Sequence, residues 1–251
     1  MAPVATPAIV LATLRYGDTS KIVRLATRDL GIQSAIAKGA FRPKSRFGAA
    51  LQVLSDGQAQ LYLKEGRDLQ TLGAFDLQKL RVGLAGSLDR FAAANALAEV
   101  MLRCAPAAPH PEAFEALRDG LDALEIAPAV AVEVVALRLL WRLVAVLGFA
   151  PALDHCARCA APLDPAGGLA FSPRDGGALC SRCATGLPVS RLTADDAAGL
   201  RYLVAGTGEL PVLDPAHAAA HRRLLARWVR EHLGEGAPLP ALDLWQERDR
   251  A

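Results

Sequence analysis

Four cysteines form two closely spaced pairs, Cys156 with Cys159 and Cys180 with Cys183, in the pattern C-x2-C-x20-C-x2-C. A C-x2-C turn presents two thiolates on one side, and two such turns supply four soft ligands for tetrahedral Zn²⁺ at about 2.3 Å. Four protein ligands leave no position for water or substrate. The spacing therefore predicts one structural Zn²⁺ per chain, with no catalytic role for the metal.

The segment between the two pairs is rich in proline and glycine and has few residues that could form a core of its own. A metal would then supply much of the folding energy of this insert, at about residues 154–186. Two alternatives are paired disulfides and a redox C-x2-C motif. Disulfides are disfavoured if the protein is cytoplasmic, as expected below. The second would need a strand–helix setting, which the proline and glycine residues do not predict.

The chain of 251 residues has a formal net charge of only +2, but its charge is unevenly distributed. Residues 1–50 contain eight Lys and Arg against two Asp, which is a balance of +6. A basic end on a nearly neutral chain favours an anionic partner at that end. The alternative is a solvated strand face that carries Lys and Arg without binding anything.

The first part of the chain has the pattern of a small β-barrel. Partial alternation and short apolar runs predict five strands, at residues 8–16, 21–28, 32–39, 58–64 and 69–75. Five short strands in about 70 residues suit a closed barrel better than a two-sheet sandwich. Between the third and fourth strands, Gly39 to Ala50 is predicted to be a long basic loop.

From Asp76 onward, apolar residues recur every three to four positions, which is typical of helices. The chain is thus predicted to be an α+β multidomain protein, with a barrel at 1–76 and an α-helical domain at 77–251. The first predicted helix has Asp76 as its N-cap, and Gly83 and Gly86 weaken it. Further helices are predicted at 112–126, 128–149, 193–204 and 215–233, and Thr193 is the predicted N-cap of the helix at 193–204.

The last of these helices carries a possible second anion-binding surface. Arg223, Arg227 and Arg230 share one stripe with Arg222 at its edge, and Leu224, Leu225 and Trp228 occupy the opposite face. One interpretation is an ordinary amphipathic helix with a solvated arginine face. The other is a surface for DNA phosphates or an acidic peptide.

The sequence contains none of the common phosphate-binding, dinucleotide-binding, metalloprotease or hydrolase motifs. His217 and His221 lie one helical turn apart. With no third ligand beside them in the sequence, they are interpreted as a surface pair on the helix. The prediction is that the protein is not an enzyme.

A membrane span is not predicted. The most apolar stretch, residues 129–149, is interrupted by Glu133, Arg138 and Arg142, which spread around a helix. The first residues lack the basic segment of a signal peptide. We therefore expect a cytoplasmic protein.

Several short motifs near the N-terminus occur together in one order. They are Asp18-Thr19-Ser20, Thr27 through Gly31, Ala37-Lys38-Gly39-Ala40, and a basic loop that ends near Leu51-Gln52. In this order and together with the cysteines, they resemble the bacterial RecO recombination-mediator family. The closing segment GAPLPALDLWQ is also similar to that family. One departure follows Gln52, where the family usually has an aromatic residue and a proline.

The resemblance implies an OB-fold barrel, a helical domain that carries a four-cysteine zinc-finger insert, and a non-enzymatic role in DNA repair. RecO-like proteins bind single- and double-stranded DNA and anneal complementary strands. They also work with RecR and single-stranded-DNA-binding protein to load recombinase. We would then expect the protein at the nucleoid, with the tail of single-stranded-DNA-binding protein held by the helical domain near Arg138 and Arg142.

A barrel of this class tracks a nucleic-acid backbone along a basic groove. Phe41 and Phe47 either stack on bases or pack into the barrel, and the sequence does not choose between these roles. The alternative function is a non-enzymatic adaptor whose barrel and zinc module only bridge protein partners. The residues expected to contact phosphates are Arg24, Lys38, Arg42, Lys44 and Arg46.

Overall fold

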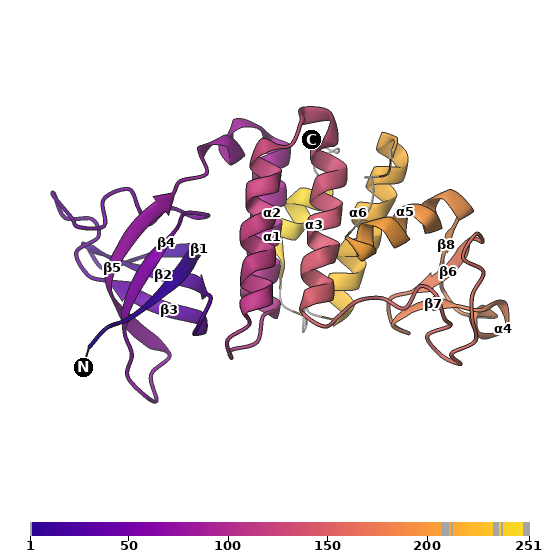
Figure 1. Ribbon diagram of the computed structural model, residues 1–251, viewed down its shortest axis with the longest axis horizontal. Coiled ribbons are helices and arrows are strands. Elements are labelled where there is room, and N and C mark those ends of the chain that lie inside the picture. The colour runs from indigo at the N-terminus through magenta and orange to yellow at the C-terminus, as the bar shows by residue number, and fades with distance from the viewer. Residues whose placement is uncertain (1, 207–210, 212, 233–235, 237, 248–251) are drawn as a thin grey trace. The chain divides into compact units, whose positions relative to one another are not determined.

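The computed structural model describes residues 2–206, 211, 213–232, 236 and 238–247 (Figure 1). The chain forms two compact units, Met1–Ile126 and Ala127–Ala251. The first contains the barrel and two helices, and the second contains the cysteine module and the remaining helices. Among the described helices, none has the length and apolar surface that a membrane span requires.

The five strands are β1 (Val4–Tyr16), β2 (Ser20–Thr27), β3 (Gly31–Ala37), β4 (Asp56–Tyr62) and β5 (Leu69–Lys79). They close into a barrel in the order β1-β2-β3-β5-β4, in which only β3 and β5 pair in parallel. Closure removes the unpaired sheet edges, and this small closed barrel confirms the predicted OB-fold.

Strand β1 closes the barrel because it pairs with two neighbours. Its first half lies against β4, with Val4 opposite Leu61, and its second half lies against β2, with Arg15 opposite Lys21. The register shifts between Val10 and Ala12, and such an irregularity bends a strand. The inward side chains of these strands form a fully buried core.

The predicted helix beginning at Asp76 is wrong at its start. Residues 76–79 continue β5, with Asp76 opposite Gln58, because β4 supplies backbone partners for them. A 3-10 turn follows at Val82–Gly86, and helix α1 (Leu88–Cys104) begins only after it. Its N-cap is Ser87, whose hydroxyl accepts the backbone N–H of Arg90 at 3.2 Å. The glycines that weakened the predicted helix lie in the 3-10 turn.

Helix α2 (Pro111–Ile126) packs against α1 and is tied to the barrel through Arg81. The side chain of Arg81 is fully buried. Its guanidinium donates to Asp122 at 2.6 Å, to Asp56 at 3.1 Å and to the carbonyl oxygen of Leu54 at 3.0 Å. The domain limit predicted at residues 76 and 77 stays a prediction, although packing groups both helices with the barrel.

The contribution of Asp122 to the contact between α2 and the barrel can be tested through the stability of the protein. Partial burial raises the pKa of Asp122, but hydrogen bonds from Lys79 and Arg81 outweigh burial and hold the pKa below its usual value. Because its side chain is 42% exposed, we expect Asp122→Asn to lower the free energy of unfolding by only about 1 kcal/mol at pH 7.

The effect should depend on pH in one direction. A carboxyl with a lowered folded-state pKa stabilises above its ordinary pKa of about 4, and the contribution is lost as pH falls through the lowered value. In urea unfolding, the free energies of unfolding of the wild type and of Asp122→Asn should therefore converge at acidic pH. Asp119→Asn, on the exposed side of the same helix, is the control. Equal losses in the two variants would contradict the assignment.

In the second unit, helix α3 (Val132–Val146) contacts both α5 (Ala194–Ala205) and α6 (Pro215–His232). The predicted helix at 128–149 thus begins with a 3-10 turn, Ala129–Ala131, and becomes α-helical only at Val132. Thr193 caps α5 as predicted, since its hydroxyl accepts the backbone N–H of Asp196 at 3.2 Å. The predicted helix end at Leu233 lies outside the described residues. A final helix, α7, spans Pro240–Glu247.

Three short strands and one short helix form the rest of this unit: β6 (Leu169–Ser172), β7 (Gly177–Leu179), α4 (Ser181–Ala184) and β8 (Ser190–Leu192). The strands pair in the order β7-β6-β8. The sheet is joined to α6 by Trp228, whose ring centroid lies 5.4 Å from that of Phe171 on β6 and 6.0 Å from that of Trp141 on α3.

Candidate functional site

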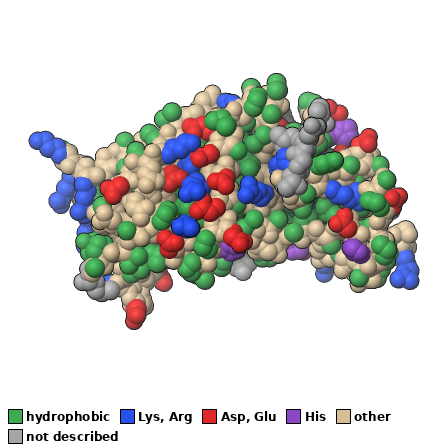
Figure 2. Space-filling view, in the orientation of Figure 1, with side chains coloured by type: hydrophobic (Ala, Val, Ile, Leu, Met, Phe, Trp, Pro, Cys, Tyr) green, Lys and Arg blue, Asp and Glu red, His purple; other side chains and the backbone are tan. Residues whose placement is uncertain are grey.

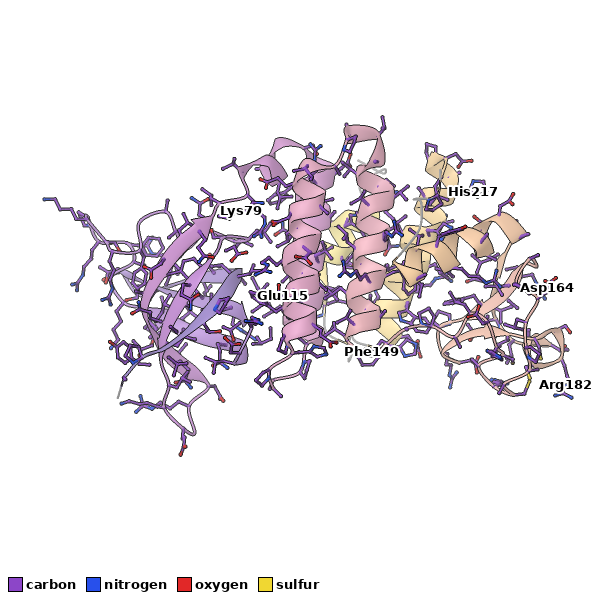
Figure 3. The ribbon with its side chains drawn as sticks, viewed as in Figure 1. Lys79, Glu115, Phe149, Asp164, Arg182 and His217 are labelled. Atoms are coloured by element: carbon purple, nitrogen blue, oxygen red, sulfur yellow. The ribbon has the colours of Figure 1, made fainter. Side chains whose placement is uncertain are left out.

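The four cysteines predicted to bind metal come together. Their sulfur atoms all lie within 4.8 Å of one another, and the Sγ atoms of Cys159 and Cys180 are 3.8 Å apart. Four sulfurs around one tetrahedral ion with bonds of about 2.3 Å are separated by about 3.8 Å. Both the donor set and the spacing therefore fit one metal ion at this end of the second unit, where Figure 3 labels Arg182.

Local backbone structure explains how the pairs meet. The first pair lies on a tight turn, in which Ala160 donates its N–H to the carbonyl oxygen of Cys156 at 2.9 Å. The turn is attached to β7, because the N–H of Ala157 donates to the carbonyl oxygen of Ala178 at 2.8 Å. Cys180 follows β7 directly and is the N-cap residue of α4. Strand β7 thus places both turns around one point.

The thiols have unequal acidities. Burial raises the pKa of Cys156, but backbone N–H groups that include those of Cys180 and Cys159 outweigh burial and lower the pKa to about 6. Hydrogen bonding to Cys180 and Cys159 keeps the proton on Cys183 and raises its pKa to about 12. A cation would reverse this second effect, so metal binding should release protons from the cluster.

The fifth cysteine, Cys104, is separate from this cluster. It is the last residue of α1, and burial raises its pKa to about 12. It therefore stays a thiol at neutral pH, and it does not belong to the group of four sulfur atoms that lie together.

The expected DNA-contacting residues lie on the barrel. Lys38, Arg42, Lys44 and Arg46 are exposed in or beside the predicted basic loop, and Arg24 is exposed on β2. Figure 2 shows Lys and Arg side chains gathered at one end of the barrel. Accessible cations on one small domain can contact the phosphates of a nucleic acid.

The basic loop is ordered as a series of turns. Arg42 donates its N–H to the carbonyl oxygen of Gly39 at 3.0 Å, and Ser45 donates to that of Arg42 at 3.0 Å. The N–H of Phe41 donates to the carbonyl oxygen of Thr19 at 2.9 Å, which ties the loop to the β1–β2 turn. These hydrogen bonds fix the backbone positions from which the loop's cations project.

The two phenylalanines have different roles. Phe47 is only 1% exposed and belongs to the barrel core, so its prediction as a base-stacking residue is wrong and the packing alternative applies. Its ring anchors the loop to the barrel. Phe41 is 46% exposed and stays available for stacking.

The sequence did not single out Arg15 and Lys21 as site residues. The Arg15 guanidinium carbon lies 5.5 Å from the centre of the Phe41 ring, and the Lys21 ammonium nitrogen lies 5.3 Å from it. Their positions on either side of the β1–β2 turn could have indicated that they face each other. Together the three residues form a cationic aromatic platform.

The arginine stripe on α6 is exposed as predicted at Arg223, Arg227 and Arg230. Arg222 does not border that stripe. It is 3% exposed and donates to Glu133 on α3 at 2.6 Å, because the helix turns it toward the core.

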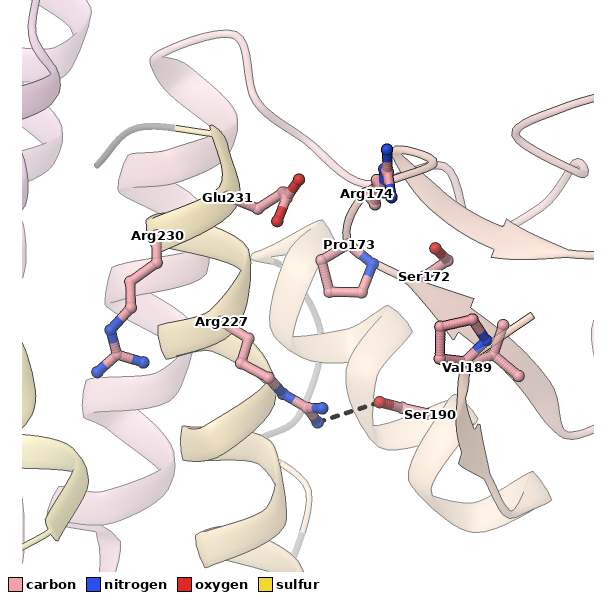
Figure 4. A pocket seen from close by; sticks show the side chains of 9 residues that line it. Ser172, Pro173, Arg174, Val189, Ser190, Arg227, Arg230 and Glu231 are labelled. Atoms are coloured by element: carbon pink, nitrogen blue, oxygen red, sulfur yellow. Dashed lines mark hydrogen bonds between the residues drawn. The ribbon is translucent and has the colours of Figure 1, made fainter. Parts of the chain in front are cut away.

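Two arginines of the stripe line a pocket of about 470 Å³ that also contains Arg174 and Glu231 (Figure 4). Arg227 donates to the hydroxyl of Ser190 at 3.0 Å, and Arg230 pairs with Asp243 on α7. Because Asp243 partly balances Arg230, Arg223 and Arg227 would supply most of the charge of a second anion surface. The solvated and anion-binding interpretations both stay open.

Comparison with known proteins decides the family. The family model "Recombination protein O N terminal" matches residues 1–81, and "Recombination protein O C terminal" matches residues 85–242. The chain belongs to the RecO family. The protein is 35% identical to the DNA repair protein RecO of Anaeromyxobacter sp. (strain K) over 237 residues, which cover 90% of each chain.

Two further relatives carry the same description. DNA repair protein RecO of Rubrobacter xylanophilus is 34% identical over 92% of this chain and 90% of its own. That of Nocardioides sp. is 35% identical over 91% of this chain and 94% of its own. The protein is therefore a DNA repair protein of the RecO family, and the predicted family is confirmed. The two RecO segments meet between β5 and α1, where the 3-10 turn lies.

Proposed function

We propose that this RecO-family protein is a non-enzymatic recombination mediator that binds single- and double-stranded DNA and anneals complementary strands. With RecR, it would help to load recombinase on DNA coated by single-stranded-DNA-binding protein, in the cytoplasm at the nucleoid. The observation that supports this most directly is the ordered, exposed basic loop of the barrel.

The chemistry of the barrel favours contact with the nucleic-acid backbone over contact with base edges. The exposed cations outnumber the exposed aromatic residues beside them, and Phe41 is the exposed aromatic residue of the loop. Phosphate contacts position a strand without reading its sequence. An annealing protein needs this property, because the bases must stay free to pair.

For the cysteine site, the donor set favours Zn²⁺. Four thiolates in tetrahedral spacing are typical of structural zinc, and they leave no ligand position for a substrate. When bound, zinc supplies folding energy to the module. The core cluster around the cysteines is small, with Cys156, Leu179 and Ala184 as its buried members.

The second unit is proposed to bind the tail of single-stranded-DNA-binding protein near α3. Arg142 is exposed on this helix and would meet an acidic peptide. The alternative function, an adaptor that only bridges proteins, needs no DNA affinity.

The test is a fluorescence strand-annealing assay, with bare and with protein-coated single strands, combined with a salt titration of DNA affinity. If each of five basic residues contacts one phosphate, log affinity should fall with log salt at a slope of roughly −3 to −4, about −0.7 per contact. Annealing should decline over the same salt range. Weak binding that salt does not change would support the adaptor instead.

A further inference from the structure

Two histidines and an aspartate meet between α5 and α6, outside the sites described above. His217 and His221 lie one turn apart on α6, and Asp196 lies in the first turn of α5. The Nε2 atoms of His221 and His217 lie 3.7 and 4.0 Å from the same oxygen, Oδ1 of Asp196. Figure 3 labels His217. The structure thus places a carboxylate beside the two histidines, which the sequence alone did not show.

His221 is not the surface residue that its spacing predicted. It is only 1% exposed, because α6 turns it toward α5. Neither of its ring nitrogens, nor Oδ1 of Asp196, makes a hydrogen bond within the part of the chain that the structure describes. Buried polar groups are rarely left in this state in folded proteins, so an unpartnered group needs an explanation.

Hydrogen-bonding contacts with neighbouring residues orient the side chains of His217 and Asp196. Nδ1 of His217 lies 2.7 Å from a carboxylate oxygen of Asp214, and the second oxygen of Asp196 accepts the hydroxyl of Thr193 at 2.8 Å. A histidine that ligates a metal through one nitrogen commonly donates its other N–H to a carboxylate, which fixes the tautomer and the ring orientation. This arrangement leaves Nε2 of His217 facing Asp196.

We propose that His217, His221 and Asp196 form a second metal site, which binds a divalent transition ion of the Zn²⁺ class. Two imidazoles and one carboxylate suit zinc and its neighbours better than Mg²⁺ or Ca²⁺, which prefer oxygen ligands alone. The ion would join α5 to α6 and keep one position open to solvent.

The geometry requires a small adjustment. Ligand atoms around a tetrahedral ion with bonds of about 2.05 Å lie about 3.3 Å apart, so the two separations from Asp196 must shorten by about 0.4 and 0.7 Å. The two imidazoles must also approach each other, since among the described residues the four cysteines are the group that already has metal-ligand spacing. Rotation of the half-exposed His217 ring and of the Asp196 carboxylate can supply this. Three carboxylates lie near His217 and three arginines line the adjoining pocket, so the local charge is balanced and the donor set, not net charge, favours the ion.

The experiment uses the full chain with its cysteine site already loaded with Zn²⁺ and titrates it with Co²⁺ at neutral pH. Calorimetry gives the stoichiometry, and visible absorption reports the ligands, since only thiolates give strong sulfur-to-cobalt charge-transfer bands. We expect one further Co²⁺ per chain, with the weak bands of nitrogen and oxygen ligands and no charge-transfer band.

Variants distinguish a metal site from an internal ion pair. His217→Ala, at a half-exposed position that should tolerate the change, is expected to weaken Co²⁺ binding about 100-fold or more, and Asp214→Asn about 10-fold to 100-fold. Asp195→Asn is the matched control. It removes one negative charge, as Asp214→Asn does, but from a residue next to Asp196 that is not a proposed ligand, so Co²⁺ binding should be nearly unchanged. No Co²⁺ uptake beyond the cysteine site, or equal binding by His217→Ala and Asp195→Asn, would overturn the proposal.

Discussion

Replacing Cys156 by Ser is expected to abolish stoichiometric zinc binding and to loosen residues 154–186, while the barrel stays folded. Cys156 is the buried ligand and the one whose pKa falls to about 6, so it contributes a thiolate most readily. A serine hydroxyl at that place is a poor ligand for zinc. Elemental analysis of the native protein should give one zinc per chain, and the variant should give close to none.

The expected loss is large because the module has little else to hold it. Structural zinc contributes on the order of 10 kcal/mol in small domains, and the core cluster around the cysteines has three buried members among the described residues. Hydrogen exchange should therefore accelerate most in the two cysteine turns. It should change less at Phe171, which packs against Trp228 on α6.

Cys104→Ser provides the control, since it removes a thiol from α1 and leaves the cluster intact. It should retain full zinc content and normal exchange at residues 154–186. Native protein without zinc, or full zinc content after Cys156 and Cys180 are both replaced, would show that the cluster is not a zinc site.

Local sequence patterns were sufficient for most of the barrel and for the cysteine ligands. Alternation and turn residues located all five strands, because each strand is short and its turns are encoded within a few positions. The two cysteine pairs were recognised because a metal imposes a fixed spacing on each pair. Both features depend on neighbours in the sequence.

The predictions that failed depended on distant residues. Asp76 lies in a strand because β4, about twenty residues earlier, offers it a ladder partner. Phe47 is buried because the loop folds back over the barrel, and Arg222 is buried because Glu133 receives it 89 residues away. Asp196 meets the histidines of α6 only through helix packing. Such contacts have no local signature.

The second large effect concerns the basic loop, where reversing Arg42 and Lys44 to Glu should weaken DNA binding about 100-fold at low salt. Each reversal removes one phosphate contact and introduces a repulsion, and we expect the two effects together to lower DNA affinity roughly tenfold. The salt slope should become shallower by about 1.4, since two contacts of about 0.7 are lost. The loss should be uniform across DNA sequences, because phosphate contacts carry no base information.

Folding should not change in this variant, because both side chains are exposed. Lys44 has a backbone φ of 60°, a conformation that lysine and glutamate adopt at similar cost, so thermal stability and zinc content should match the wild type. The matched control reverses Arg223 and Arg227, which are equally exposed but lie on α6. If the loop variant keeps its affinity and salt slope while the α6 variant loses both, the barrel loop is not the DNA site. The arginine stripe would then be the leading candidate, because Arg223 and Arg227 are exposed on one face of α6.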